Sequence, residues 1–553
     1  MIAISQPAAA CAKHVAVHSG PENERHTFDA VVSPRDLHDT YLPAFKKLVT
    51  EAGVEAVMGA YNRTNGEPCC ASHLLLVDIL RGAWGFTGHV VSDYGSPTDI
   101  YTTHKVSGDA AEAAALALHA GCDIGCDTLY ADYLAAALER GLVTEADIDR
   151  ALARTLATRF KLGMFDPPER VPYAATPLSI VGSDAHRQLA REAAVKSIVL
   201  LKNDDVLPIR AGVRSICVLG PNAASIDALL GNYYGLNDSL TTLLEGIVGR
   251  VPAEVKVEYR PAVQLTLGNS NAVDWSVRVA GESDLTITCM GLSPLLEGEE
   301  GDAMLSTEAG DRSELGLPAA QVAYLRQIAA AGTKIVLVLC GGSPIALGEV
   351  EDLVQAVVFV WYPGQEGGRA VAEVLFGDVA PSGKLPLTFP RSVDQLPPYE
   401  DYAMAGRTYR YMTAEPLYPF GFGLSYTRFA YGDLTLDKER IAAGDTLSLR
   451  CTVRNAGSVE AEEVVQWYLS DLEASVPVPR HKLVGFQRVR LAPGESRSLE
   501  FTIRPEMLAL VDEEGRSRIE PGQFRITVGG CSPGARGIAL GAPEPAAAVF
   551  TVA

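Results

Sequence analysis

The chain has 553 residues, of which 47% are hydrophobic and 21% are charged, and its formal net charge is −21. At roughly 150 residues per domain, this length predicts three or four domains, each large enough for its own core. An acidic surface repels phosphate backbones and anionic lipids, so the charge argues against nucleic-acid and membrane partners. The binding of a neutral small molecule is not opposed by this negative charge. No apolar run reaches the ~18 residues that a transmembrane helix needs.

The first residues, MIAISQPAAACAKH, lack the charged start and long apolar stretch of a secretory signal. Ten cysteines are few for this length, Cys69 and Cys70 are adjacent, and no zinc-like pair of CxxC motifs is present. Reduced and mostly buried thiols are therefore expected, which fits a cytoplasmic protein.

Residues 1–165 alternate short apolar runs with helical stretches. We predict buried strands at 54–61 and 88–93, with helices at 41–53, 72–84 and 109–121 between and after them. Thr144 is expected to cap a helix that runs from 145 to 162 and stops at Gly163. This β/α alternation predicts a parallel sheet or barrel.

A proline-rich linker follows, and we place it at 166–195. A second α/β unit is expected over 196–400, because near-continuous apolar runs predict a sheet covered on both faces. Its strands are predicted at 215–219, 284–290, 334–340 and 355–361, and a helix at 318–331. Residues 401–428 are interpreted as a connecting segment. From 429 to 553, short alternating strands separated by turn signals predict a small β-sandwich.

Three clusters carry candidate chemistry. The first, CAKHVAVHSGPENERHTFDA, supplies fixed donors from Lys13, His14, Arg25 and His26, which suits a ligand rich in hydroxyl groups. A structural role for these polar residues is the alternative. Metal binding by His14, His26 and the intervening His18 is disfavoured, because their spacing does not fit one helical face and the nearby cations oppose a metal ion.

The second cluster is VVSDYGSP, in which an apolar strand runs directly into Asp93. A carboxylate at the C-terminal end of a parallel strand is where α/β barrels place catalytic groups. Asp93 is equally interpretable as a helix cap or a buried acceptor.

The third cluster, LLEGEEGDAMLSTEAGDRSELGLPAAQ, follows a predicted strand and carries four glutamates: Glu297, Glu299, Glu300 and Glu308. A solvated acidic loop is one interpretation. The other is that one glutamate faces a cleft with a raised pKa.

Taken together, these clusters resemble glycoside hydrolase family 3. Further matches are MGAYNRTNGEPCCAS, KSIVLLKNDDVLPI, VLGPNA and GNYYG, and then GQEGGRAVAEVLFGDVAPSGKLPLTFP and YPFGFGLSYTRF. The similarity covers nearly the whole chain, in the family's order. It implies an α/β multidomain protein with a (β/α)8-type barrel, an α/β sandwich and a C-terminal fibronectin type III-like β-sandwich.

The resemblance also implies a retaining glycosidase without a metal or organic cofactor. Asp93 matches the nucleophile, and Glu299 of the LEGE motif matches the acid/base, with Glu297 or Glu308 as alternatives. Lys13, His14, Arg25 and His26 match sugar-binding positions, and Tyr61 matches a tyrosine near the nucleophile. The HSGPENERHTFDA form is more similar to β-xylosidases than to β-glucosidases. A β-xyloside is therefore the first expected substrate, and a β-glucoside or α-L-arabinoside the next.

The family's barrel normally begins well over a hundred residues before the KH motif, which here is Lys13–His14. A partial barrel is therefore expected over 1–165, with an open sheet edge. A misassigned start is the favoured explanation, ahead of a true fragment or a partner chain that supplies the rest.

Other classes of function remain open. A weakly active or inactive remnant would bind carbohydrate without turning it over. A dinucleotide-binding enzyme is disfavoured, because GPNAAS after the strand at 215–219 lacks the GxGxxG turn. A β-sandwich adhesion protein would leave the first two clusters unexplained. The sequence also leaves open whether the chain forms a homo-oligomer.

Overall fold

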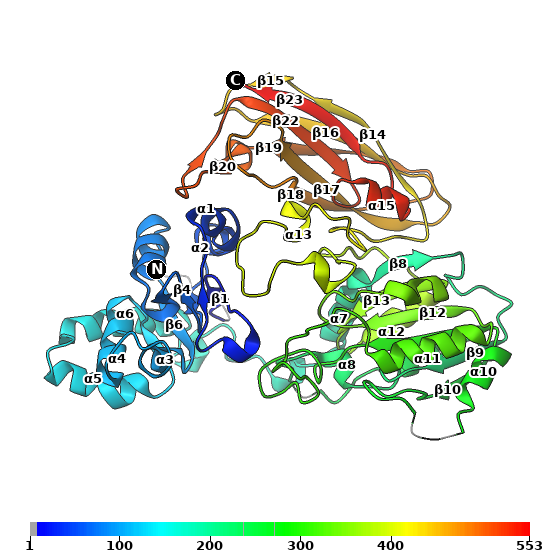
Figure 1. The fold of residues 1–553 in the computed structure, drawn as a ribbon, viewed down its shortest axis with the longest axis horizontal. Coiled ribbons are helices and arrows are strands. Elements are labelled where there is room, and N and C mark those ends of the chain that lie inside the picture. The colour runs from blue at the N-terminus through cyan, green and yellow to red at the C-terminus, as the bar shows by residue number, and fades with distance from the viewer. Residues whose placement is uncertain (1–7, 236, 270, 272) are drawn as a thin grey trace. The chain divides into compact units, whose positions relative to one another are not determined.

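The structure is a computed structural model that describes residues 8–235, 237–269, 271 and 273–553, with the backbone alone at residue 349 (Figure 1). The chain folds into two compact units. The first is built from residues up to Ile180 together with two later segments, Pro398–Met404 and Val511–Arg518. The second contains the remainder. Within the described residues, no helix has both the length and the apolarity to cross a membrane.

The first unit contains a parallel sheet of four strands. Their order is β1 (Cys11–Val15), β3 (Ala56–Gly59), β6 (His89–Tyr94) and β7 (Ile124–Cys126). The two strands predicted here are confirmed, although β3 is shorter than predicted. Because parallel strands share one carboxyl edge, the residues at the ends of β1, β3 and β6 gather there.

Helices cover this sheet, and two of its strands contribute fully buried valines, Val57 and Val90, to the core. Alanines along α4 allow close packing against the same core. Thr144 caps α6 in a reciprocal capping box with Asp147, as predicted. The helices are α1 (Pro34–Asp36), η2 (Leu37–Tyr41), α2 (Pro43–Thr50), η4 (Leu74–Ala83), α3 (Ser96–Thr102), α4 (Ala110–His119), α5 (Leu129–Glu139) and α6 (Glu145–Lys161).

The two later segments are held in the first unit by specific bonds. Tyr41 donates its hydroxyl hydrogen to the carbonyl of Tyr402 at 2.7 Å, and the backbone N–H of Met404 donates to Oδ2 of Asp36 at 3.0 Å. An ion pair of 2.7 Å joins Arg35 to Glu513. This arrangement differs from the contiguous domains that the sequence predicts, because these contacts join residues more than 300 positions apart.

The predicted linker at 166–195 is wrong in its second half, where the chain forms the helix α7 (Asp184–Ser197). The hydroxyl of Ser183 accepts a hydrogen bond from the N–H of His186 and so caps the first turn. Ala194 is buried on the inner face of α7 and joins the core of the second unit. Local capping and this burial account for a helix that proline-rich flanking sequence obscures.

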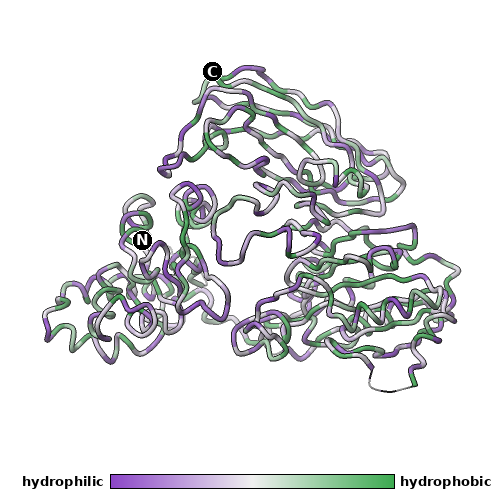
Figure 2. Tube along the Cα trace, viewed as in Figure 1, coloured by the Kyte–Doolittle hydropathy of each residue, from purple (hydrophilic) through white to green (hydrophobic). Residues whose placement is uncertain are grey.

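The second unit contains a six-stranded sheet in the order β10-β9-β11-β12-β13-β8. Only β8 is antiparallel to its neighbour. Alternate residues of β12 enter two different cores on the two faces of the sheet, so it is covered on both sides, as predicted. Figure 2 shows the hydrophobic character of these strands. They are β8 (Val199–Asn203), β9 (Ser215–Leu219), β10 (Lys256–Arg260), β11 (Leu285–Gly291), β12 (Ile335–Cys340) and β13 (Ala356–Trp361).

Helices pack on the two faces of this sheet. The face that carries Leu337 is covered by α11, and the opposite face by α9, α12 and α7. The helix predicted at 318–331 is confirmed as α11. The helices of this part of the chain are α8 (Asp227–Leu230), α9 (Leu243–Arg250), α10 (Ser276–Glu282), α11 (Ala319–Ala330), α12 (Gly367–Phe376) and α13 (Thr408–Tyr411).

The C-terminal part is a β-sandwich of a three-stranded sheet, β14-β16-β19, and a five-stranded sheet, β15-β23-β22-β17-β18. Inward-facing residues of both sheets, such as Leu449 and Trp467, form one core. All ten cysteines of the chain are outside disulfides, as expected. The main elements are β14 (Phe429–Leu436), β15 (Arg440–Ile441), β16 (Leu447–Asn455), β17 (Ala461–Asp471), β18 (Lys482–Leu491), β19 (Ser496–Ile503), β22 (Gly522–Gly529), α15 (Ala535–Ala539) and β23 (Ala546–Val552).

Candidate active site

The carboxylate of Asp93 lies where β6 ends and the chain turns into α3. Gly95 has a φ of 75°, in the left-handed region, so the chain turns sharply before α3 begins at Ser96. Asp93 is left near the carboxyl edge of the parallel sheet, with 15% of its side chain exposed. It is therefore accessible to a small molecule at the edge where α/β proteins bind their ligands.

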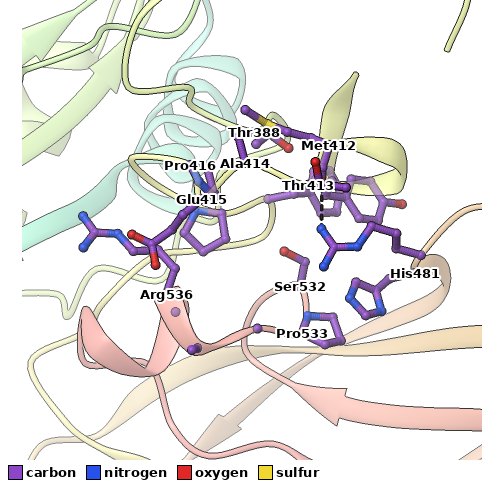
Figure 3. Close-up of a pocket in the computed structure, with 17 residues that line it drawn as sticks. Thr388, Met412, Thr413, Ala414, Glu415, Pro416, His481, Ser532, Pro533 and Arg536 are labelled. Atoms are coloured by element: carbon purple, nitrogen blue, oxygen red, sulfur yellow. Dashed lines mark hydrogen bonds between the residues drawn. The ribbon is translucent and has the colours of Figure 1, made fainter. Parts of the chain in front are cut away.

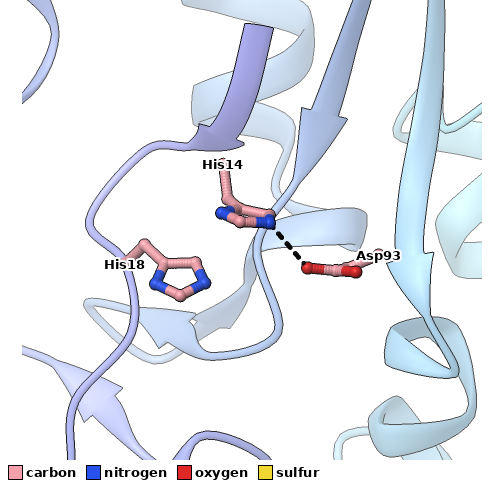
Figure 4. Close-up of side chains that lie close together, drawn as sticks. All are labelled: His14, His18 and Asp93. Carbon is pink, nitrogen blue, oxygen red and sulfur yellow. Dashed lines mark ion pairs between the residues drawn. The ribbon is translucent and has the colours of Figure 1, made fainter. Parts of the chain in front are cut away.

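Among the residues that the structure describes, each carboxylate oxygen of Asp93 has one hydrogen-bond or ion-pair partner. Oδ2 lies 2.9 Å from Nε2 of His14 (Figure 4). Oδ1 accepts a hydrogen bond from the backbone N–H of Tyr94 at 2.8 Å. His14 belongs to β1 and Asp93 to β6, on either side of β3, so this pair reaches across a strand. The two contacts fix the orientation of the carboxylate.

The environment of Asp93 favours its charged form. Burial raises the pKa of this carboxyl, but the hydrogen bonds from His14 and the Tyr94 N–H and the positive charges of His14 and Lys13 act in the opposite direction. The outcome is a pKa below the usual value for aspartate. Asp93 is therefore ionised at neutral pH, as a carboxylate nucleophile must be.

A second imidazole, that of His18, lies beside His14 with 4.2 Å between the ring centroids (Figure 4). Burial and then the charge of His14 lower the pKa of His18 to about 4, so its ring is neutral at pH 7. Possible ligand atoms of His14, His18 and Asp93 lie within 4.8 Å of one another. The charges of Lys13 and Arg25 act on the same ring and oppose a metal ion there.

The remaining histidine of the first cluster, His26, does not join this group. Its Nδ1 lies 2.7 Å from Oδ2 of Asp99, and its ring meets the ring of Tyr61 edge-on at 4.7 Å. The guanidinium carbon of Arg25 lies 4.7 Å from the centroid of the same tyrosine ring, and Nη1 of Arg25 pairs with Glu22 at 2.8 Å. The structure thus brings Arg25, His26 and Tyr61 together.

Asp99 and Glu22 are partners that sequence reasoning missed. Burial raises the pKa of Asp99 above its usual value, although the hydrogen bond from His26 acts against this. Asp99 is the fourth residue of α3 and follows the VVSDYGSP motif closely, so the helical period could have pointed it toward the same edge. Lys13 is exposed on β1 and contributes through its charge on Asp93.

Another residue that the sequence did not reveal is Tyr402, which lies in the late segment of the first unit. Its hydroxyl oxygen accepts the backbone N–H of Gly20 at 2.7 Å, and the hydroxyl lies 3.4 Å from the carbonyl of His18. Its ring also packs beside Phe28 and Tyr41. Tyr402 therefore supports the loop that carries His18, from a position more than 380 residues away along the chain.

In the second unit, the loop after β11 carries the candidate acids. Glu297 is saturated with donors: Oε1 accepts the N–H of Gly342 at 2.6 Å and the hydroxyl of Tyr362 at 2.8 Å, and Oε2 accepts the hydroxyl of Ser343. Its side chain is only 11% exposed. A carboxylate held by three donors anchors the loop and is poorly suited to move protons.

The neighbouring glutamates differ from Glu297 in their surroundings. Glu299 is half-buried and accepts a hydrogen bond from the hydroxyl of Tyr233, a residue of the GNYYG stretch. Glu300 and Glu308 are exposed. Asp93 and Glu299 belong to the two different compact units.

Comparison with known proteins agrees with this architecture. Residues 5–158 match the glycosyl hydrolase family 3 N-terminal domain, residues 198–426 match the C-terminal domain of the same family, and residues 463–532 match a fibronectin type III-like domain.

Individual relatives extend the similarity along the chain. A xylan 1,4-β-xylosidase from Xylanibacter ruminicola is 32% identical, over 94% of this chain and 77% of that protein. A periplasmic β-glucosidase from Salmonella typhimurium is 33% identical, over 95% of this chain and 70% of its own length. A solved β-glucosidase from Erythrobacter marinus superimposes with a TM-score of 0.86 at 33% identity, covering 99% of this chain and 74% of that one. The chain belongs to glycoside hydrolase family 3 and is a glycosidase, with the family's two α/β domains and a C-terminal fibronectin type III-like β-sandwich.

Proposed function

We propose that this glycosidase releases a non-reducing-end β-linked sugar with retention of configuration, and that Asp93 is its nucleophile. One observation carries the proposal: an ionised carboxylate, oriented by His14 and the Tyr94 N–H, lies at the carboxyl edge of the parallel sheet. We rank β-xylosides first, supported by the motif form around Arg25 and by the similarity to a xylosidase. β-Glucosides and α-L-arabinosides follow.

The reaction proceeds in two displacements. In the first, an oxygen of Asp93 bonds to the anomeric carbon while the bond from that carbon to the leaving oxygen breaks, and Glu299 gives its proton to the leaving oxygen. In the second, Glu299 takes a proton from water, the water oxygen bonds to the anomeric carbon, and the bond to Asp93 breaks. Two inversions give net retention.

The other residues of the first unit hold the sugar. Lys13, His14, Arg25 and His26 offer donors to its hydroxyl groups, and Tyr61 supplies a buried ring against which Arg25 and His26 pack. These contacts fix the anomeric carbon over the carboxylate, and positioning of this kind lowers the entropic part of the barrier.

The choice of Glu299 as acid/base rests on the contrast within its loop. Glu297 is committed to three donors, and Glu308 is exposed. Glu299 is half-buried and accepts a hydrogen bond from Tyr233, so it is accessible and oriented without being enclosed by donors.

The decisive test measures hydrolysis of aryl β-xyloside, β-glucoside and α-L-arabinoside by the wild type, Asp93→Ala, Glu299→Gln and the control Glu308→Gln. We expect Asp93→Ala to lose essentially all turnover and azide to restore release of an inverted glycosyl azide. NMR of the first-formed anomer should show retention with the wild type. Equal rates for wild type and Asp93→Ala would reject the nucleophile, and a wild type that binds sugar without turnover would identify a non-catalytic remnant.

A further inference from the structure

A pocket of about 190 Å³ lies within the second unit, between residues 388–420 and the β-sandwich (Figure 3). Its lining from the sandwich comes from Arg480 and His481, which precede β18, and from the stretch 532–537 around α15. None of its residues is assigned to the reaction proposed above.

Rigid apolar groups form much of the wall. Pro416, Pro419 and Pro533 line the pocket, and the rings of Tyr409 and Phe420 stack with 4.2 Å between their centroids. Proline and stacked aromatic rings lose little conformational freedom when a ligand binds, so this wall is prepared in advance.

The imidazole of His481 contributes a hydrogen-bond acceptor. Ser470 donates its single hydroxyl hydrogen to the carbonyl of Arg480 at 2.7 Å, so its oxygen can only accept from Nδ1 of His481, 2.9 Å away. Burial, followed by the charges of Arg480 and Arg525, lowers the pKa of His481 to about 4, so the ring is neutral at pH 7. Its Nε2 therefore carries a lone pair, and it makes no hydrogen bond within the described residues.

Donors surround this acceptor. Oγ1 of Thr388 is buried and has no hydrogen-bond partner in the part of the chain that the structure describes. Ser532 is 5% exposed, and Figure 3 shows its side chain beside His481. One guanidinium nitrogen of Arg480 donates to the carbonyl of Met412, which leaves its other N–H groups for a ligand.

Donors and an acceptor above proline and aromatic walls match the hydroxyl edge and the apolar face of a sugar ring. We propose that this pocket is a second, non-catalytic site that binds one neutral pyranose unit. The guanidinium groups of Arg480 and Arg536 also line the pocket, so an anionic sugar is the competing ligand. The neutral assignment rests on the lone pair of His481 Nε2 and the carboxylate of Glu415, which would face the oxygens of an anion. The site stands independently of the roles of Asp93 and Glu299.

The test uses the full chain carrying Asp93→Asn, so that the probe stays intact, and measures bound xylobiose per chain by equilibrium dialysis at saturation. Ala535→Trp places a large side chain in the pocket, whereas Ala539→Trp adds the same group at an exposed position of the same helix that does not line it. We expect Ala535→Trp to bind one xylobiose fewer per chain than Ala539→Trp. This difference holds whether or not the proposed catalytic site also binds the probe.

Two further measurements test the donors of the pocket and the charge of its ligand. Arg480→Met retains the aliphatic stem but removes the donors, and it should weaken xylobiose binding at the pocket at least fivefold. Because it also removes the hydrogen bond to the carbonyl of Met412, the thermal midpoint is measured beside it to show that the chain is folded during the binding measurement. Glucuronate serves as the anionic probe. Equal binding counts in Ala535→Trp and Ala539→Trp would overturn the site, and pocket-dependent binding of glucuronate in preference to xylobiose would overturn the neutral-sugar assignment.

Discussion

Nε2 of His14 lies 2.9 Å from Oδ2 of Asp93, across the intervening strand β3. This contact, with the Tyr94 N–H and the charge of Lys13, holds the pKa of Asp93 below its usual value against the effect of burial. Strand order alone thus joins the KH motif to the SDYG motif, which lie almost eighty residues apart in the sequence.

Replacing His14 with alanine should raise the pKa of Asp93. Less of the nucleophile is then ionised at a given acidic pH, so the acid limb of the kcat/KM profile should move to higher pH. Loss of a charge-assisted hydrogen bond costs about 1.5–3 kcal/mol, or roughly a 10- to 150-fold fall in kcat/KM. The control is His73→Ala, because His73 is an exposed histidine paired with Asp78. An unmoved acid limb in His14→Ala would contradict this account.

Substitution of Glu297 should lower the thermal stability of the protein, whereas substitution of Glu299 should lower its hydrolytic activity. Glu297→Gln replaces an acceptor of three donors with an amide, which costs about 1.5–3 kcal/mol and lowers the thermal midpoint by roughly 3–12 °C. Glu299→Gln should leave the midpoint unchanged and abolish hydrolysis of substrates with poor leaving groups. Calorimetry and aryl xyloside assays on both variants check this, and the reverse pattern would reassign the acid.

The ion pair between Lys384 and Glu463 is buried: Nζ lies 3.1 Å from Oε1, with 12% and 3% of the side chains exposed. Burial raises the pKa of Glu463 although Lys384 acts against it. Lys384→Met should therefore leave an unpaired buried carboxylate and destabilise the protein by about 3–5 kcal/mol at pH 7.

The penalty in Lys384→Met should shrink as the pH falls. Without the lysine charge the folded-state pKa of Glu463 rises further, so the carboxyl takes up a proton and becomes neutral at acidic pH. Denaturant unfolding at pH 7 and pH 5 measures the difference. Adding Glu463→Gln to Lys384→Met should recover stability at pH 7, and a pH-independent penalty would count against the buried pair.

Tyr402→Phe should disturb sugar binding from outside the cluster that binds the sugar. The change removes the acceptor of the buried Gly20 N–H, a loss of about 1–3 kcal/mol, and loosens the loop that carries His18. We expect KM for aryl xyloside to rise severalfold with a smaller change in kcat. Tyr133→Phe, at a partly exposed tyrosine of α5, is the matched control and should behave as wild type.

Features set by local pattern were predictable from the sequence. The apolar period predicts β6, β12 and α11, and the capping signal at Thr144 places the start of α6 correctly. The partners of Asp93 and Tyr61 gather because parallel strands share a carboxyl edge, a consequence of strand order that the motifs only suggest.

Other features depend on contacts that no local pattern encodes. The hydroxyl of Tyr233 reaches Glu299 from 66 positions away, and Tyr402 supports Gly20 from 382 positions away. The strand β8 runs antiparallel to its neighbour β13, so the βα alternation did not reveal it. The burial of Glu297 separates it from Glu299, although both lie in the same acidic stretch of sequence.

Because Pro398–Met404 and Val511–Arg518 belong to the first unit, this unit cannot be completed until late in synthesis of the chain. A ribosome that has finished Ile180 must still translate several hundred codons before Arg518 emerges, a delay of roughly 20–70 s at bacterial to eukaryotic elongation rates. Until Tyr402 and Glu513 have been synthesised, the backbone N–H of Gly20 and the guanidinium of Arg35 lack these partners. The nascent N-terminal unit must therefore persist in an unfinished form while the rest of the polypeptide is made.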